Sequence, residues 1–189
     1  GCVEVTIPGR ACPHAVSHNT NLAKCMELAL HNGVDSLTGV QVGPRTGDPA
    51  EFTCIEDLWE AYRLQAEHVN RVGAFISNCG QLDQIHTWPQ VYRSILTDDC
   101  ITRGREMNAG GAIYNYHSVS AIGIPNVADS LWAVDKLVFR EGALTMRELV
   151  AALDADFDGC EPLRLMLLNR AEKYGNDCPE VDEWAARVA

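Results

Sequence analysis

The sequence has little positive charge and almost no lysine. Its 15 lysine and arginine residues compare with 26 aspartate and glutamate residues, which gives a formal net charge of −11. Only Lys24, Lys136 and Lys173 are lysines. Nucleic acids and anionic membranes bind proteins through basic surfaces that neutralise phosphates. The composition therefore argues against both as partners.

The sequence also lacks long apolar runs and an export signal. No run approaches the roughly 20 apolar residues that span a bilayer, and no charged segment followed by an apolar one opens the chain. We therefore expect a cytoplasmic protein. Residue 1 is glycine rather than methionine, so we expect a processed chain or a piece of a longer one.

Cysteine is abundant, but the spacings typical of metal sites are absent. None of the eight cysteines forms a C-x-x-C pair, and Cys12, His14 and His18 lack the two close pairs of a structural zinc site. Cys25, Cys100 and Cys160 lie in or beside helical patterns, where buried free cysteines are common. We expect no metal and eight reduced thiols.

Composition and patterning indicate a single α/β unit rich in helix. The chain has 189 residues, of which 47% are hydrophobic and 22% charged, as in an ordinary globular domain. It contains no internal repeat or low-complexity linker. We therefore expect residues 1–189 to belong to one domain.

Apolar periodicity places the expected helices and strands. Alternation over 3–7 and the run 111–119 predict strands. Apolar residues at helical spacing predict helices over 21–30, 55–76, 88–96, 127–138, 145–153 and 163–174, with a last one after Pro179. Two capping boxes, Thr53 to Glu56 and Thr145 to Glu148, mark helix starts. Asn32-Gly33 marks a helix end.

The feature that bears on chemistry is Gly1-Cys2-Val3-Glu4. In an extended segment residues i and i+2 project to the same side, so Cys2 and Glu4 would face one space. A neighbouring carboxylate raises the pKa of a thiol and makes it a poor thiolate nucleophile. The pair suits chemistry in which sulfur carries a hydrogen atom and the carboxylate moves a proton. The same spacing also fits a buried cysteine followed by a surface glutamate.

Several segments occur in the order found in one enzyme family. They are Gly1-Cys2-Val3-Glu4, Ile7-Pro8-Gly9-Arg10, Asn21-Leu22-Ala23-Lys24, Asp98-Asp99-Cys100-Ile101, Gly110-Gly111-Ala112, Tyr114-Asn115, Asn126-Val127-Ala128-Asp129 and Lys173-Tyr174-Gly175-Asn176-Asp177. Together they resemble the glycyl radical enzymes, the pyruvate formate-lyase-like family, in its dehydratase, decarboxylase and C–N lyase branches. The first segment resembles the loop of the thiyl-radical cysteine.

The resemblance implies part of an α/β barrel with a cysteine loop and a glycine loop at its centre. The glycine loop of the family has the form Arg-Val-x-Gly-Tyr, which this sequence does not contain. We therefore expect an internal fragment that begins at the cysteine loop, lacks the glycyl radical domain and is inactive by itself.

The resemblance also implies a mechanism and its partners. A radical S-adenosylmethionine activating enzyme would install the radical on the absent glycine, and no bound cofactor is expected. Cys2 would then take hydrogen from a small-molecule substrate, and Glu4 would act as general acid or base. The setting would be the anoxic cytoplasm, and the complete enzyme would be a homodimer.

The residues expected to contact substrate depart from the pattern of the family. Where diol- and hydroxyproline-type dehydratases carry Trp-His-Asp, an ungapped alignment places Ala15 and Val16, with His14 one step earlier. His117 begins a segment that replaces Gly-Pro-Gln-Gly-Val-Gly. We take His14, Val16, Asn115 and His117 as candidate substrate-binding residues, and hydrogen-bonded loop histidines remain the other interpretation. His18 is a further possible contact.

The reaction type follows from the resemblance only in outline. Dehydratase-like C–O cleavage is favoured, with the substrate unknown. A glycyl radical decarboxylase, a C–N lyase or a formate acetyltransferase-type enzyme are the alternatives. A helical interaction domain without catalysis is the alternative outside enzymes, and the ordered matches along the chain argue against it.

Overall fold

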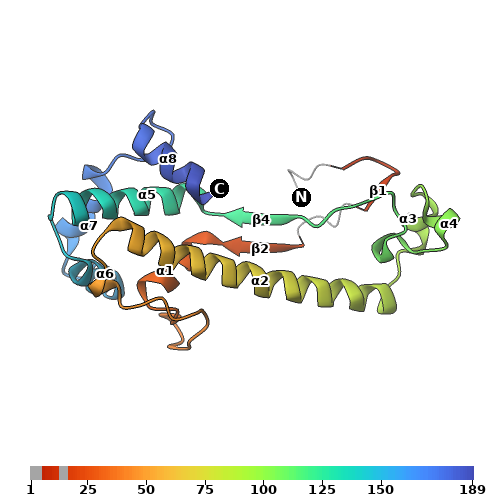
Figure 1. Ribbon diagram of the computed structural model, residues 1–189, viewed down its shortest axis with the longest axis horizontal. Helices are drawn as coiled ribbons and strands as arrows, with labels where there is room; N and C mark the ends of the chain where they lie inside the picture. The colour runs from red at the N-terminus through yellow and green to blue at the C-terminus, as the bar shows by residue number, and fades with distance from the viewer. Residues whose placement is uncertain (1–5, 13–16) are drawn as a thin grey trace. The chain divides into compact units, whose positions relative to one another are not determined.

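Helices supply most of the secondary structure in the residues that the structure describes, 6–12 and 17–189. The coordinates are a computed structural model of the chain. The chain divides into two compact units. Unit 1 comprises Gly1–Thr20 and Asn70–Ser120, and unit 2 comprises Asn21–Val69 and Ala121–Ala189. Figure 1 gives the order of the elements along the chain.

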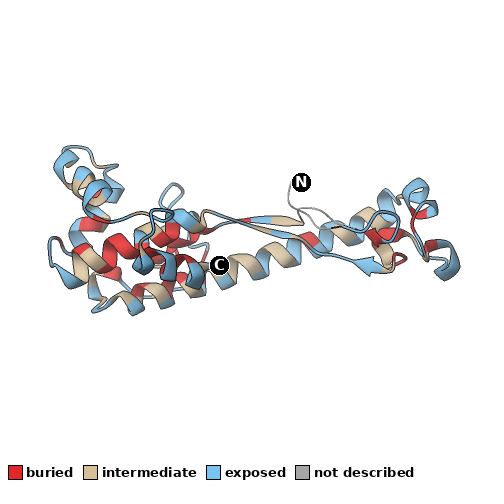
Figure 2. Ribbon diagram, turned by 90° about the horizontal axis from the view of Figure 1, so that it is seen from above, coloured by how far each residue is buried: buried red, intermediate tan, exposed pale blue. Residues whose placement is uncertain are grey.

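Unit 2 is a helical assembly around the larger hydrophobic core. Its central pair is α5 (Ile124–Val134) against α8 (Pro179–Val188), and α1 (Leu22–Leu30) also packs on α5. The first half of α2 (Ile55–Thr87), the turn η1 (Pro49–Glu51), the π-helical segment η3 (Asp135–Arg140), α6 (Met146–Asp154) and α7 (Glu161–Arg170) complete it. The buried residues of Figure 2 concentrate in these helices, and the core includes Leu58, Leu131, Leu137 and Val181.

Local signals in the sequence set several helix ends correctly. The Asn21 side chain caps α1 by accepting a hydrogen bond from the backbone N–H of Lys24. Asn32 and Gly33 end that helix with φ angles of 52° and 82°, the left-handed region that glycine and asparagine enter most readily. Thr145 and Glu148 form the expected capping box of α6. These ends depend on residues within one helical turn, which is why the sequence predicts them.

The capping box predicted from Thr53 to Glu56 is wrong. Asp57 caps the start of α2, because its carboxylate accepts hydrogen bonds from the backbone N–H groups of Thr53 (2.7 Å) and Cys54 (3.2 Å). Glu56 instead pairs with Arg187 of α8 at 2.9 and 2.7 Å. A bidentate carboxylate–guanidinium pair is among the stronger side-chain interactions. Glu56 therefore pairs with a distant arginine, whereas the local sequence pattern predicts that it caps the helix start.

His31 links the end of α1 to the end of α6. Its Nδ1 lies 2.7 Å from the carbonyl oxygen of Glu27, and its Nε2 lies 2.7 Å from Oδ1 of Asp154. A backbone carbonyl and a carboxylate only accept hydrogen bonds, so this geometry favours the protonated imidazole, in which both ring nitrogens donate. Burial disfavours the charged form, but the hydrogen bonds to Asp154 and Glu27 outweigh it and raise the pKa of His31.

Unit 1 contains the second half of α2 and shorter elements. They are α3 (Val91–Ile95), α4 (Cys100–Arg103), the turn η2 (Met107–Ala109), β1 (Ala11–Cys12) and β3 (Tyr114–Asn115). The helix α2 continues to Thr87, eleven residues beyond the expected end at Ile76. The helix expected over 88–96 begins only at Val91, after Pro89, which disfavours helical geometry in the residue before it.

The strands differ from those expected. Thr6 and Ile7, the described part of the strand predicted over 3–7, are not in a strand, and the remainder of that prediction lies outside the described residues. The run 111–119 contains β3 and the start of β4 (Val119–Ile122). The sheets of the described residues are two-stranded, β1 with β3 and β2 (His18–Asn21) with β4. A closed barrel needs many more strands, so the expected barrel is not visible in the described part of the chain.

Candidate functional site

The segment after the predicted cysteine loop is held by backbone hydrogen bonds. Cys2, Glu4, His14 and Val16 themselves lie outside the described residues. The carbonyl oxygen of Ile7 accepts from the N–H groups of Arg10 and Ala11, each at 3.1 Å, and that of Gly9 accepts from Asp98 at 2.6 Å. These hydrogen bonds form a turn at residues 7–11 that leads into β1.

Strand β1 pairs in parallel with β3, about one hundred residues later in the chain. Ala11 is the partner of Tyr114, and Cys12 is the partner of Asn115. The backbone N–H of Tyr114 donates to the carbonyl of Arg10, and that of Tyr116 donates to Cys12, each at 3.1 Å. The structure therefore brings the continuation of the cysteine segment beside Asn115.

Asn115 is exposed and held against its own strand. Its Nδ2 donates to the carbonyl oxygen of Ala112 at 3.1 Å. Its partner across the two strands, Cys12, is buried, and the Sγ of Cys12 lies 3.3 Å from Oδ1 of Asn108. The amide of Asn115 keeps its oxygen as an acceptor beyond that bond, so it has the capacity to receive a hydrogen bond from a substrate hydroxyl.

His117 lies just before β4, and its ring is near that of His18, the first residue of β2. The two ring centroids are 5.9 Å apart and the planes are tilted by 52°. His117 is exposed, whereas both ring nitrogens of His18 are buried and lack a hydrogen-bond partner among the described residues. The sequence separation of 99 residues makes this pairing a product of the fold.

Two tyrosines and an arginine lie at β3. Arg10 and Tyr114 belong to segments that resemble the family, whereas the sequence motifs do not single out Tyr116. The rings of Tyr114 and Tyr116 are nearly parallel, with 3° between their planes and 6.4 Å between centroids. The guanidinium of Arg10 lies 6.0 Å from the centre of the Tyr114 ring and 3.7 Å from the carboxylate of Asp98. Alternation along the strand puts residues i and i+2 on one face, so the pair 114 and 116 was detectable from sequence.

The cysteines that the structure describes carry their sulfur atoms as thiols. They are Cys12, Cys25, Cys54, Cys79, Cys100, Cys160 and Cys178, and Cys2 lies outside the described residues. Burial raises the pKa of the Cys25 thiol to about 11 and, with Glu106 nearby, also raises that of Cys100. Such thiols stay protonated and serve as packing groups.

A family described as pyruvate formate lyase-like matches residues 1–189. The chain belongs to the pyruvate formate lyase-like family. This confirms the resemblance seen in the sequence motifs to the glycyl radical enzymes.

Relatives in this family are dehydratases and lyases. The chain is 35% identical to trans-4-hydroxy-L-proline dehydratase of Clostridioides difficile over 97% of its own length and 23% of that protein. It is 32% identical to isethionate sulfite-lyase of Oleidesulfovibrio alaskensis, over 100% and 23% of the two chains. The B12-independent glycerol dehydratase of Clostridium butyricum, solved with glycerol, matches with a TM-score of 0.92, 34% identity, and coverage of 100% and 24%.

The chain thus spans about a quarter of the length of the curated relatives it matches. In the described part of the chain, every helix is too short or too polar to cross a membrane.

Proposed function

We propose that this chain supplies the cysteine loop of a glycyl radical lyase, with dehydratase-type C–O cleavage as the reaction. The observation that carries the proposal is the Gly1-Cys2-Val3-Glu4 motif in a chain of the pyruvate formate lyase-like family. The names of the relatives support the reaction class, since several are dehydratases. Both units would belong to one catalytic domain of the complete enzyme and form part of its α/β barrel.

The roles of Cys2 and Glu4 follow from the chemistry of a thiol and a carboxylate. A radical on a glycine of the complete enzyme, installed by a radical S-adenosylmethionine activating enzyme, supplies the oxidising equivalent that converts Cys2 to a thiyl. The thiyl takes a hydrogen atom from a substrate carbon and becomes a thiol. Glu4 donates a proton to the neighbouring hydroxyl, which leaves as water, and its carboxylate regains a proton from another O–H or N–H group of the substrate radical. Cys2 then returns its hydrogen atom to the product carbon and is again a thiyl.

Substrate would be bound by residues around the same loop. Asn115 and His117 are the proposed contacts from the described residues, because β3 places Asn115 beside the continuation of the cysteine segment. His14 and Val16 are the proposed contacts from the segment that precedes β2. A carbon- or sulfur-centred radical requires a site from which water and oxygen are excluded, and we expect this site to be closed in that way. The enzyme would act in the anoxic cytoplasm as a homodimer.

The test uses the complete, activated enzyme and the substitution Cys2→Ser. An O–H bond is too strong for a glycyl radical to break, so turnover should be abolished while the glycyl signal in electron paramagnetic resonance persists. Near-normal turnover would refute the radical role of Cys2. Glu4→Gln keeps size and hydrogen bonding, and it should lower the rate on the order of 10²–10⁴-fold. A surface glutamate would instead tolerate the change without loss of rate.

A further inference from the structure

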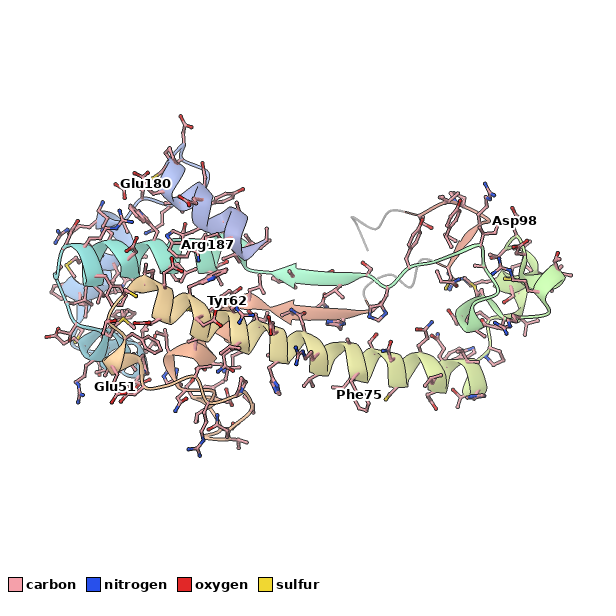
Figure 3. The ribbon with its side chains drawn as sticks, in the orientation of Figure 1. Glu51, Tyr62, Phe75, Asp98, Glu180 and Arg187 are labelled. Carbon is pink, nitrogen blue, oxygen red and sulfur yellow. The ribbon has the colours of Figure 1, made fainter. Side chains whose placement is uncertain are left out.

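The second half of α2 carries an apolar stripe that unit 1 leaves exposed. Val72, Phe75, Ile76, Cys79 and Leu82 recur at the spacing of one helix face,. Phe75, Ile76 and Leu82 are 69%, 63% and 59% exposed, and Cys79 is exposed as well. In Figure 3 the labelled side chain of Phe75 projects outward from the helix.

The opposite face of this helix segment packs on the rest of unit 1, and its side chains are small or polar. Ser77 is buried, and Gln81 donates from Nε2 to the carbonyl oxygen of Asn108 at 3.0 Å. A Cβ atom on Gly73 would lie 2.7 Å from Cδ2 of His18, so the helix approaches that ring through its backbone. A surface helix normally buries its apolar stripe and exposes its polar side. Here the orientation is reversed.

Charge is also missing from the exposed stripe. The eleven residues 72–82 include no lysine, arginine, aspartate or glutamate, although the chain as a whole is 22% charged. Exposed helices of soluble proteins usually carry charged residues on the solvent side. A contiguous uncharged apolar surface of this kind marks a contact with another protein segment.

The hydrophobic core of unit 1 is small in the part of it that the structure describes. Its buried hydrophobic cluster among the described residues consists of Cys12, Cys100, Met107 and Ala112. Large side chains near the end of α2 and in α3 are exposed, with Trp88 and Tyr92 at 75% each. A unit of this size needs a larger core, and the stripe on α2 is the nearest material for one.

We propose that the stripe Val72–Leu82 packs permanently against a segment of the same polypeptide outside residues 1–189. Relatives of this chain are about four times as long, and the fold of the whole chain is found within such a longer chain with a TM-score of 0.92. A protein of that length has ample residues to cover the stripe. The absence of charge favours a permanent contact over one that must dissociate.

Cys79 reports on this contact without any substitution. In the complete polypeptide, N-ethylmaleimide should label Cys79 at least about 100-fold more slowly than in the urea-unfolded protein, as for a thiol that reacts only after local opening. Mass spectrometry of peptides identifies the labelled residue. The protection should be unchanged on tenfold dilution. Labelling at the unfolded rate would overturn the proposal, and protection lost on dilution would assign the stripe to a second copy and overturn it too.

A pair of substitutions in the complete polypeptide gives an independent test. Phe75→Asp places a charge in the stripe, and Asn78→Asp places the same charge on an exposed position at the edge of it. Phe75→Asp should lower the melting temperature by several degrees or prevent folding, whereas Asn78→Asp should change it by about one degree or less. Equal melting temperatures for the two variants would contradict the proposed burial.

Discussion

Gly73 lies in the middle of α2, where glycine normally weakens a helix. Replacing such a glycine with alanine usually stabilises a protein by about 0.5–1 kcal/mol, because alanine loses less conformational entropy on folding. At Gly73 the added Cβ would lie 2.7 Å from Cδ2, 3.0 Å from Nε2 and 3.2 Å from Cγ of His18. Carbon atoms pack best at about 3.5–4.0 Å, so the ring would have to move by roughly 1 Å.

The His18 ring has little room for such a move, since both of its nitrogens are buried. Overpacking of this kind costs about 1–3 kcal/mol. After subtraction of the helix-propensity gain, we expect Gly73→Ala to lower the free energy of unfolding by about 0.5–2 kcal/mol. Gly80 in the same helix is a matched control, because nothing lies within 4 Å of its Cβ position. Gly80→Ala should raise that free energy by about 0.5–1 kcal/mol.

The double variant decides the cause. In a His18→Ala background the space beside residue 73 is empty, so Gly73→Ala should become stabilising, like Gly80→Ala. Urea unfolding followed by circular dichroism gives the four free energies of the cycle, and we expect a coupling between positions 18 and 73 of at least about 1 kcal/mol. If Gly73→Ala stabilises the parent protein as much as Gly80→Ala does, the packing of His18 on α2 is not as described.

Three further substitutions test unit 2. His31→Gln should cost about 1 kcal/mol of unfolding free energy near pH 6. The pKa of His31 is raised in the folded state. The stabilisation by His31 is therefore complete below about pH 6.5 and is lost as the pH rises through the folded pKa. Urea unfolding should show the two free energies of unfolding converging at alkaline pH, and a difference that does not change with pH would contradict the charged link. Arg187→Lys keeps the charge but loses the paired hydrogen bonds to Glu56 and the stacking of the guanidinium at 4.5 and 4.4 Å on two tryptophan rings. It should lower the melting temperature by a few degrees. The control Arg147→Lys, at an exposed arginine, should leave the melting temperature unchanged. Thr145→Ala should cost about 1 kcal/mol through the lost helix cap, while Thr145→Ser should retain most of it, as thermal unfolding would show.

The sequence predicts the parts of the fold that depend on a few neighbouring residues. The Asn32-Gly33 helix end and the Thr145 to Glu148 capping box are formed as expected, and the side chain of Asn21 caps the start of α1. Each is complete within one or two turns of helix, so no distant contact is needed to specify it. The family is recognisable for a similar reason, since its motifs are short and occur in a fixed order.

The candidate site is predictable only in its residue types. The motif Cys2 to Glu4 names the chemistry, and the resemblance to the family draws attention to Asn115 and His117. Neither indicates that β1 pairs with β3 in the register Cys12 to Asn115, or that His117 lies 5.9 Å from His18. These contacts join segments about one hundred residues apart, and loop closure over that distance is specified by the packing of the whole unit.

Tertiary structure also decided where local and distant interactions compete. Glu56 suits a capping box in the sequence, but the stronger bidentate pair with Arg187 takes it, and Asp57 caps the helix instead. The apolar stripe of α2 shows the same limit. Periodicity predicts that the segment is a helix with one apolar face, because that follows from 3.6 residues per turn. Which way this face points is a matter of tertiary packing, in which Gly73 lies against His18 and Gln81 bonds to Asn108 on the opposite side.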